Sequence, residues 1–313
     1  EHALSWKLSQ SNHVETVYTA PGNGGTENNV AIDVNDLDGL AEFAQKNNCF
    51  TVVGPEDPLA SGIVDKFNKL NLKVFGPSQA AAQLESSKIW AKNFMKRNNI
   101  PTAQFGVFKT NTEASKYLEN ANMPIVVKAD GLASGKGVYI CEDLESSNKA
   151  VEEIFNGKFG LANQVLIEEF LQGDEMSYFV LSDGKIFKRF NTAQDHKRVG
   201  EGDRGKNTGG MGAYSPSGLI NAELDKKIIT EIVNPTFEAI KDMGESYKGF
   251  LYVGLIIKEN EPYLIEYNVR MGDPECQTIL PLLANDLLDL ILSCCDETLE
   301  SQDFFGRKKK VFV

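Results

Sequence analysis

The sequence lacks the features that mark several common classes of protein. None of its apolar runs reaches the roughly 20 residues that a transmembrane helix needs, and the residues after Glu1 do not resemble a secretory signal. Basic residues are in the minority, because 32 Lys and Arg stand against 44 Asp and Glu and give a net charge of −12. Such a chain has no basic stripe to displace counterions from nucleic acid. We therefore expect neither a membrane protein nor a general nucleic-acid-binding protein.

Cysteine and histidine are also scarce. The five cysteines are odd in number and show no CxxC spacing, which predicts reduced thiols in a cytoplasmic protein. His196 lies in a polar segment, where a lone histidine is more often solvated than catalytic. No Ser/His/Asp spacing and no signature of a cysteine nucleophile is present. The sequence therefore does not predict covalent catalysis by a side chain.

The first part of the chain alternates strands with helices of about a dozen residues. At 313 residues the chain suggests two or three domains. This alternation predicts a doubly wound, parallel α/β domain, with ligands at the turns beyond the strands. The predicted strands are Val14–Thr19, Cys49–Val53 and Lys73–Phe75; the helices are Glu1–Gln10, Asp36–Asn47 and Gly62–Leu70; the turns are Pro21–Gly25, Gly54–Pro58 and Gly76–Ser78.

The remainder predicts a different, α+β organisation. A small lid is expected between Pro124 and Val180, and both termini resemble interrupted elements, so we expect the sequence to be part of a longer chain. The other predicted elements are helices at Ala80–Asn98, Glu145–Phe155, Ala222–Met243 and Asp286–Cys295, a long polar loop at Gln194–Ser215, a sheet segment at Phe250–Tyr267 and a new strand within Lys308–Val313. The predicted divisions are residues 1–79, 80–122, 123–182, 183–307 and 308–313.

The segment Glu266–Glu275 carries the strongest chemical signal. It follows the apolar run Pro262–Ile265, and strand alternation places Glu266 and Asn268 on one face with Arg270 next on the same side. A carboxylate and an amide oxygen suit Mg²⁺, and a guanidinium suits a phosphoryl group. An edge strand with solvated polar residues fits these residues equally well.

A glycine-rich turn between two strands predicts a phosphate cradle. Gly131, Gly135 and Gly137 allow close approach of the backbone to phosphate oxygens, and Lys128 and Lys136 add positive charge. A Walker A loop is not predicted, because the first glycine spacing is one residue short and a strand follows in place of a helix. An ordinary glycine-rich hairpin would explain the glycines but not the two lysines.

Two further segments complete a candidate nucleotide site. The apolar strand Val165–Leu171 runs into a hinge, which suits an adenine ring, and Glu175 is placed to accept hydrogen bonds from ribose hydroxyls. A plain edge strand is the alternative. In the polar loop, Asp195, Lys197 and Arg198 could hold a small zwitterion or a phosphate.

Together these segments resemble the ATP-grasp superfamily, and within it the phosphoribosylamine–glycine ligase family. The resemblance spans nearly the whole chain. It rests on Glu1–Ala3, Pro21–Asn23, Gly54–Glu56, Leu84–Lys88, Val127–Leu132, Gly135–Gly137, Gln194–Arg198, Asn207–Tyr214 and Glu266–Glu275. It implies an ATP-grasp module with a lid subdomain after the N-terminal domain.

The resemblance also implies an activity: ATP phosphorylates glycine to glycyl phosphate, and 5-phosphoribosylamine attacks it to give glycinamide ribonucleotide. It implies Mg²⁺ or Mn²⁺ at Glu266 and Asn268. Separately, we expect a monomer. The residues implied for ATP are Lys88, Lys128, Gly135, Lys136, Gly137, Glu168, Glu169, Phe170, Leu171 and Glu175. Catalytic roles are implied for Arg270, Lys136 and Asp195.

The resemblance further assigns contacts to glycine and phosphoribosylamine. The implied residues are Pro21, Gly22, Asn23, Gly54, Pro55, Glu56, Asp195, Lys197, Gly210, Met211, Gly212, Arg270, Asp273, Pro274 and Glu275. Three departures stand out: the family's first strand and its glycine-rich loop are missing before Glu1, Lys206 replaces a proline, and the C-terminal domain is absent beyond Val313. Another ATP-grasp enzyme of purine synthesis and a non-catalytic nucleotide-binding regulator are the rival interpretations.

Overall fold

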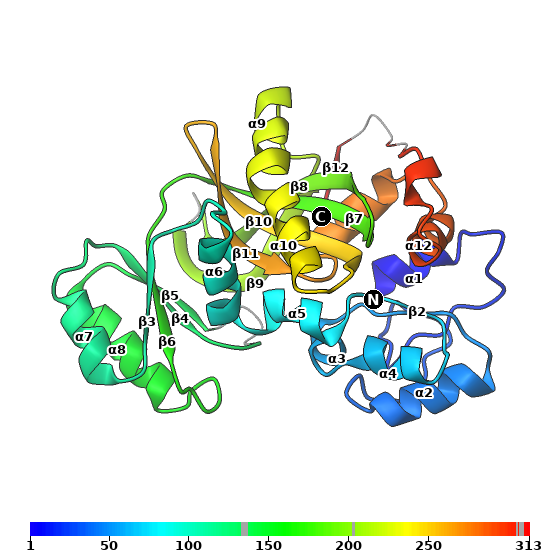
Figure 1. The fold of residues 1–313 in the computed structure, drawn as a ribbon, viewed down its shortest axis with the longest axis horizontal. Coiled ribbons are helices and arrows are strands. Elements are labelled where there is room, and N and C mark those ends of the chain that lie inside the picture. Colours follow the sequence, from blue (N-terminus) through cyan, green and yellow to red (C-terminus); the bar gives the residue numbers. More distant parts are fainter. Residues whose placement is uncertain (133–136, 202–203, 305, 307–309) are drawn as a thin grey trace.

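The computed structural model describes residues 1–132, 137–201, 204–304, 306 and 310–313. The described residues form a two-stranded, a four-stranded and a six-stranded sheet. In Figure 1 the N-terminal unit lies at the lower right, the four-stranded sheet at the left and the six-stranded sheet between them. The six-stranded sheet therefore lies next to both of the other units.

The N-terminal unit confirms the predicted parallel α/β arrangement. Its two strands pair in parallel, with Thr51 opposite Val74. Leu59 and Phe67 are fully buried beneath them. The elements in chain order are α1 (His2–Leu8), α2 (Leu37–Lys46), β1 (Thr51–Val52), α3 (Glu56–Ala60), α4 (Ile63–Lys69) and β2 (Val74–Phe75).

Two predictions for this unit are wrong. The predicted strand Val14–Thr19 makes only one isolated bridge, between Thr19 and Asn29, and most of its residues are at least partly exposed. Without a continuous partner its backbone groups cannot form a ladder. The predicted loop Gly54–Pro58 becomes helical at Glu56, because Pro58 lies in the first turn, where a missing N–H costs nothing.

The predicted helix Ala80–Asn98 is two helices, α5 (Gln79–Ser86) and α6 (Lys88–Arg97). Ser87 separates them in an extended conformation, with φ −136° and ψ 110°. Its hydroxyl accepts a hydrogen bond from the N–H of Trp90 at 3.0 Å and so caps α6. The break therefore arises from a serine that stabilises a helix start better than a helix interior.

The four-stranded antiparallel sheet lies where the lid is predicted, and we call this sheet with its two helices the lid. Its strand order is β3-β6-β4-β5, and its two helices pack on it through a separate apolar cluster. The elements are β3 (Phe105–Phe108), α7 (Asn111–Leu118), β4 (Ile125–Ala129), β5 (Val138–Cys141), α8 (Leu144–Phe155) and β6 (Val165–Glu169). Because β3 pairs with β6, this sheet takes strands from both sides of the predicted division at residues 122 and 123, and the domain divisions stay predictions.

The six-stranded sheet is antiparallel throughout, in the order β11-β10-β7-β8-β9-β12. Its strands are β7 (Asp174–Asp183), β8 (Phe187–Gly200), β9 (Arg204–Ser215), β10 (Lys248–Lys258), β11 (Glu261–Asn268) and β12 (Val311–Phe312). The strand expected within Lys308–Val313 is confirmed by β12. The predicted polar loop Gln194–Ser215 is wrong, because these residues pair as a β-hairpin, with Asp195 opposite Ala213.

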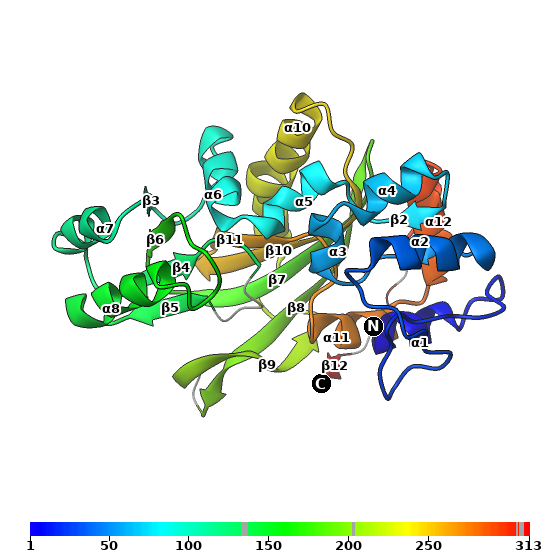
Figure 2. The same cartoon turned by 90° about the horizontal axis from the view of Figure 1, so that it is seen from below.

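Helices cover both faces of this sheet. Along β7, Tyr178 and Val180 join one apolar cluster, whereas Phe179 and Leu181 join the other. Figure 2 shows α5, α6 and α10 together on one side of the sheet. The remaining elements are α9 (Ala222–Lys227), a π-helical segment (Ile228–Val233), α10 (Asn234–Asp242), α11 (Glu275–Ile279), α12 (Leu287–Cys295) and 3₁₀ turns at Leu280–Leu282 and Leu299–Ser301.

The described residues bear on two expectations from composition. They include no helix that is both long enough and apolar enough to cross a membrane. All five cysteines are free thiols in this structure: Cys49, Cys141, Cys276, Cys294 and Cys295.

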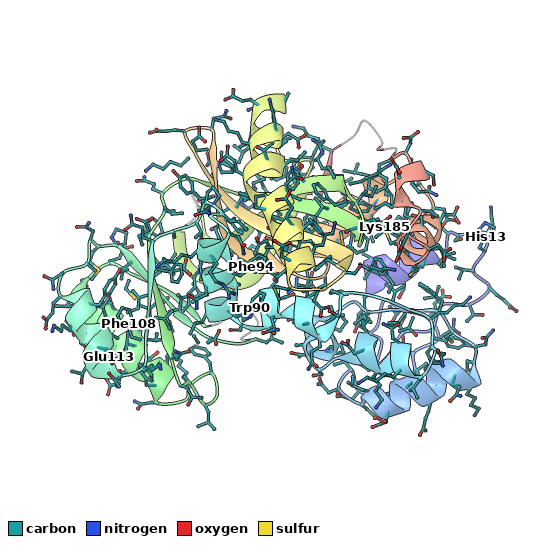
Figure 3. The ribbon with its side chains drawn as sticks, viewed as in Figure 1. His13, Trp90, Phe94, Phe108, Glu113 and Lys185 are labelled. Carbon is teal, nitrogen blue, oxygen red and sulfur yellow. The ribbon has the colours of Figure 1, made fainter. Side chains whose placement is uncertain are left out.

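An aromatic contact between α6 and β11 should contribute strongly to the stability of the fold. Phe94 is 1% exposed, stacks on Trp90 with ring centroids 5.2 Å apart, and meets Tyr267 edge-on at 6.4 Å (Figure 3). We expect Phe94→Ala to lower the free energy of unfolding by about 3–5 kcal/mol, because it leaves a cavity between helix and strand. Urea unfolding measures the change. Phe312→Ala is the control, since Phe312 is 71% exposed, and an equal loss in both variants would contradict the prediction.

Candidate active site

A cavity of about 1020 Å³ lies between the N-terminal unit, the four-stranded sheet and the six-stranded sheet. Its walls include Glu56 from the N-terminal unit, Lys128 from the lid, and Glu266 from the six-stranded sheet. Ligand sites of small molecules usually measure about 300–1,000 Å³, so this cavity is large enough for more than one substrate.

Most of the predicted site residues line this cavity. Those that do are Asn23, Gly54, Pro55, Glu56, Lys88, Lys128, Glu168, Glu169, Phe170, Leu171, Glu175, Asp195, Lys197, Glu266, Asn268, Arg270, Asp273 and Glu275. Those not among its lining residues are Pro21, Gly22, Gly137, Gly210, Met211, Gly212 and Pro274. Gly135 and Lys136 lie outside the described residues.

The end of β11 presents two oxygen-bearing side chains to the cavity. Glu266 and Asn268 both line it, as strand alternation predicts, and neither side chain has a hydrogen-bond or ion-pair partner among the described residues. Gly254 lies opposite Glu266 on β10, and a Cβ there would come within 3.3 Å of the Glu266 Cγ. The glycine therefore leaves room for this carboxylate.

Four cations surround Glu266. Burial alone would raise the pKa of its carboxyl, but the opposing charges outweigh burial and hold the pKa below its usual value. The carboxylate is therefore ionised at neutral pH. The cations, in order of effect, are Lys197, Lys128, Lys88 and Arg270.

These donors decide what kind of metal site is available. The described part of the chain contains no group of three or more His, Cys, Asp or Glu side chains that could hold a metal ion. Mg²⁺, however, is usually held by one or two carboxylates together with substrate phosphates and water. The hard oxygens of Glu266 and Asn268 fit that mode of binding, which needs no cage made of protein alone.

Lys88 joins the lid to the start of α6. Its Nζ donates to the carbonyl oxygen of Gly131 at 2.8 Å. The adjacent Asp130 accepts hydrogen bonds from the Ser87 hydroxyl and the Ile89 N–H, each at 3.1 Å. A lid carboxylate thus caps the helix that carries Lys88, which fixes the lid turn beside this lysine.

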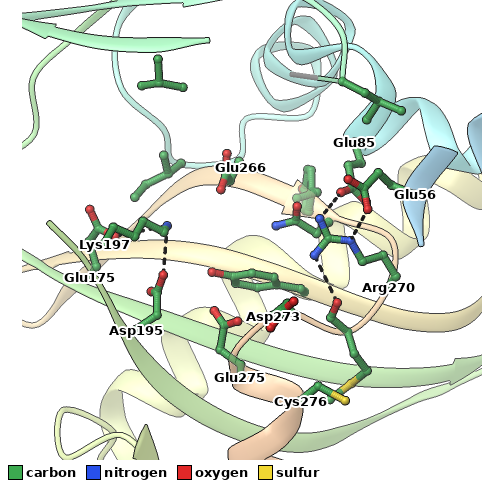
Figure 4. Close-up of a pocket in the computed structure, with 18 of the residues that line it drawn as sticks. Glu56, Glu85, Glu175, Asp195, Lys197, Glu266, Arg270, Asp273, Glu275 and Cys276 are labelled. Atoms are coloured by element: carbon green, nitrogen blue, oxygen red, sulfur yellow. Dashed lines mark hydrogen bonds and ion pairs between the residues drawn. The ribbon is translucent and has the colours of Figure 1, made fainter. Parts of the chain in front are cut away.

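Arg270 is held between two carboxylates (Figure 4). Its Nε lies 3.2 Å from Glu56 Oε2, and its Nη2 lies 2.7 Å from Glu85 Oε1. Glu85 also accepts the N–H of Val269 at 2.7 Å. Burial raises the pKa of Glu85 to about 7, although Arg270 opposes that rise. Sequence reasoning missed Glu85, because a glutamate inside a helix normally faces solvent.

A second buried charge group lies at the lid side of the cavity. Glu168 bridges two lysines, with Oε1 2.9 Å from Lys128 Nζ and Oε2 2.9 Å from Lys92 Nζ. Burial would raise the pKa of Glu168, but the two lysines lower it. Sequence reasoning missed Lys92. Its spacing of four residues from Lys88 could have signalled it, because this spacing places both on one face of α6.

The β8–β9 hairpin contributes a third charge group. Strand alternation turns Asp195 and Lys197 towards the cavity, while His196 points the other way and stacks on Tyr214 with ring centroids 6.0 Å apart. Lys197 Nζ lies 3.5 Å from Asp195 Oδ2 and 3.4 Å from Glu175 Oε2. Burial raises the pKa of Asp195 to about 6, although Lys197 opposes that rise.

The predicted substrate residues around Glu275 have structural partners. Glu275 is 2% exposed and accepts the Ser177 hydroxyl at 3.0 Å, and this hydroxyl also bonds Tyr252 at 3.0 Å. Gly210 packs against Pro274, where an added Cβ would lie 2.8 Å from the proline ring. These contacts attach the hairpin and α11 to one wall of the cavity.

Two family descriptions match consecutive parts of the chain. Phosphoribosylglycinamide synthetase, N domain, matches residues 1–85, and the ATP-grasp (A) domain of the same synthetase matches residues 86–276. The phosphoribosylamine–glycine ligase of Chlorobaculum tepidum is 46% identical over 314 residues, covering 97% of this chain and 74% of its own length. That of Neisseria meningitidis serogroup B is 49% identical over 308 residues, covering 96% and 73%.

Solved structures agree with this assignment. The phosphoribosylamine–glycine ligase of Thermotoga maritima is 33% identical, with a TM-score of 0.86 over 99% of this chain and 76% of its own. The N5-carboxyaminoimidazole synthase of Aspergillus clavatus, solved with ADP and 5-aminoimidazole ribonucleotide, is 14% identical with a TM-score of 0.71 over 99% of this chain and 78% of its own, which shows a shared fold alone. The chain therefore belongs to the phosphoribosylglycinamide synthetase family of ATP-grasp ligases.

Proposed function

We propose that the chain joins glycine to 5-phosphoribosylamine in de novo purine biosynthesis. The reaction consumes ATP and gives glycinamide ribonucleotide, ADP and phosphate. One observation of the structure carries the proposal: cations from α6, the four-stranded sheet and the six-stranded sheet region converge on Glu266 in a single large cavity. Phosphoryl transfer depends mainly on such positioning and charge stabilisation.

ATP would bind at the lid side of the cavity. Lys88 and Lys128 would hold its phosphates, and the segment from Glu168 to Leu171 would frame adenine, with Glu175 at the ribose. Val126 and Lys128 are both on β4, two residues apart, and both line the cavity, so the apolar and charged contacts come from one face of the strand. ATP would also be bound by Gly135, Lys136 and Gly137, and Lys136 would have a catalytic role as well.

Glu266 and Asn268 would hold Mg²⁺ or Mn²⁺. The ionised carboxylate and the amide oxygen have no hydrogen-bond or ion-pair partner among the described residues, which leaves them available to a hard cation. When bound, the ion would neutralise part of the charge on the phosphate groups.

The chemistry would proceed in two steps. A carboxylate oxygen of glycine attacks the γ-phosphorus of ATP, the bond to ADP breaks, and glycyl phosphate forms. The amine of phosphoribosylamine then attacks the carbonyl carbon and phosphate leaves. Arg270, held by Glu56 and Glu85, would stabilise the negative oxygens of the acyl phosphate. The lid would exclude water, which would otherwise hydrolyse the acyl phosphate.

The charged pair on the hairpin would recognise glycine. Lys197 suits the carboxylate of glycine and Asp195 suits its ammonium group. Asn23 and Gly54–Glu56 line the cavity from the N-terminal unit and, together with Asp273, would bind phosphoribosylamine. Further contacts to glycine or phosphoribosylamine would come from Pro21, Gly22, Gly210–Gly212, Pro274 and Glu275.

Omission of each substrate in turn tests the proposed reaction. We expect ADP release to require both glycine and phosphoribosylamine, because the acyl donor, glycine, and the acyl acceptor, the amine, are both consumed in each turnover. A coupled ADP assay of the full-length protein measures this requirement. ADP formation that is indifferent to both substrates would reject the ligase proposal.

The proposed metal ligand can be tested on a single strand. We expect Glu266→Ala to lower kcat by at least about 10²–10³-fold, the usual loss when a charge-stabilising group is removed. The melting temperature should stay within a few degrees of wild type. Glu261→Ala is the matched control, because Glu261 is exposed on the same strand and pairs with Lys227. Equal activity of the two variants would reject the assignment.

The raised pKa of Asp195 predicts a pH dependence. Because its pKa is about 6, the carboxylate is ionised above that pH and protonated below it. We therefore expect kcat/KM for glycine to fall about tenfold per pH unit below pH 6. Asp195→Asn should lower the plateau and abolish this dependence, whereas exposed Asp242→Asn should leave it intact. Persistence of the same limb in Asp195→Asn would assign it to another group.

A further inference from the structure

Lys92 is a buried cation to which the proposed chemistry gives no role. It lies on α6 and is 2% exposed. Its Nζ is 2.9 Å from Glu168 Oε2 and donates to the Thr102 hydroxyl at 2.7 Å. Thr102 in turn donates to the carbonyl oxygen of Leu264 on β11 at 2.6 Å. These bonds fix the ammonium group against Glu168 from the side of the six-stranded sheet.

The partner of Lys92 is also the partner of Lys128. Glu168 uses one carboxylate oxygen for each lysine, and all three side chains are at most 6% exposed. The group therefore holds two positive charges and one negative charge. Without Lys92, Lys128 and Glu168 would form a neutral pair.

This charge balance matters because Lys128 faces the cavity. A phosphate group beyond a neutral pair feels two nearly cancelling fields, whereas a phosphate beyond the triad feels a net charge of +1. In a site with an effective dielectric constant of about 20, one unit charge roughly 10 Å away changes the binding of an anion by about tenfold. The charge of Lys92 is therefore large enough to decide how strongly the group around Lys128 attracts phosphate.

We propose that Lys92 acts through Glu168 to preserve the positive charge that Lys128 presents to the phosphates of the nucleotide. Lys92 is a positioning and charge-balancing residue in this role. The inference rests on the proposed function, because it takes Lys128 to be a phosphate ligand. Burial lowers the pKa of Lys92 to about 8 against the opposing effect of Glu168, so the ammonium is still charged at neutral pH.

The test compares nucleotides that differ only in phosphate. The dissociation constants of ATP and adenosine are measured at pH 7 by calorimetry and competition, and their ratio isolates the contribution of the phosphates from that of the base. We expect Lys92→Met to weaken ATP binding about tenfold and adenosine binding little. Lys96→Met is the matched control, because Lys96 is exposed on the same helix.

A double variant separates charge balance from damage to the fold. Lys92→Met leaves Glu168 with one counterion, and Lys92→Met/Glu168→Gln restores the net charge of +1. We expect the double variant to recover the wild-type preference for ATP over adenosine. If Lys92→Met does not fold, Glu168→Gln is compared with Lys92→Met/Glu168→Gln. Removal of Lys92 in this background must lower the preference for ATP over adenosine by about tenfold.

Each result of these binding measurements either supports or overturns the inference. Loss of preference in Lys92→Met with recovery in the double variant supports the inference. An equal loss of ATP and adenosine binding, or a preference that the double variant does not recover, overturns it and assigns Lys92 to packing alone. Failure of the wild-type protein to bind ATP would reject the proposed function itself, independently of Lys92.

Discussion

The ion pair between Glu85 and Arg270 ties the N-terminal half of the chain to the strand that carries Glu266. Glu85 comes from α5, accepts the backbone N–H of Val269, and pairs with the guanidinium of the next residue. Buried ion pairs rarely add stability, because desolvation costs as much as the attraction returns. The value of this pair is geometric: it fixes the chain at the end of β11, the strand that carries Glu266 and Asn268.

Charge balance explains how an acidic chain builds a cationic site. The whole chain carries a net charge of −12, yet Lys88, Lys128, Lys197 and Arg270 converge on one cavity. Most of these cations are held by carboxylates, such as Glu168 at Lys128 and Glu56 at Arg270. Fixed partners keep the cations in place before any ligand binds, which is the preorganisation that phosphoryl transfer requires.

The polar face of β11 could be predicted because strand alternation is a local rule. Glu266 and Asn268 line the cavity, as their spacing of two requires. The hairpin β8–β9 could not be predicted in the same way, because its charged residues resemble a solvated loop. It forms a hairpin because residues pair across two strands, Asp195 with Ala213 for example. The sequence of either strand alone does not indicate which strand it pairs with.

Glu85 and Lys92 were missed for a related reason. Both are charged residues in helical segments, and such residues are almost never fully buried unless a partner compensates them. Their partners are Arg270 and Glu168, which are distant in sequence and reach the helices only through the tertiary fold. Helical periodicity records which residues share a face but does not record what that face meets.

The start of α6 links nucleotide binding to the position of the lid. Lys88 donates to the carbonyl of Gly131, and Asp130 beside it caps the helix at Ser87 and Ile89. The ammonium group has three N–H donors, so a phosphate that binds Lys88, as we propose, can share this group with the Gly131 carbonyl. The bound phosphate would then lie beside the lid turn, while the cap at Asp130 keeps the turn attached to the helix. A ligand that binds one arrangement of the lid more tightly than the other shifts the equilibrium between the two arrangements, by a factor set by the ratio of its two affinities.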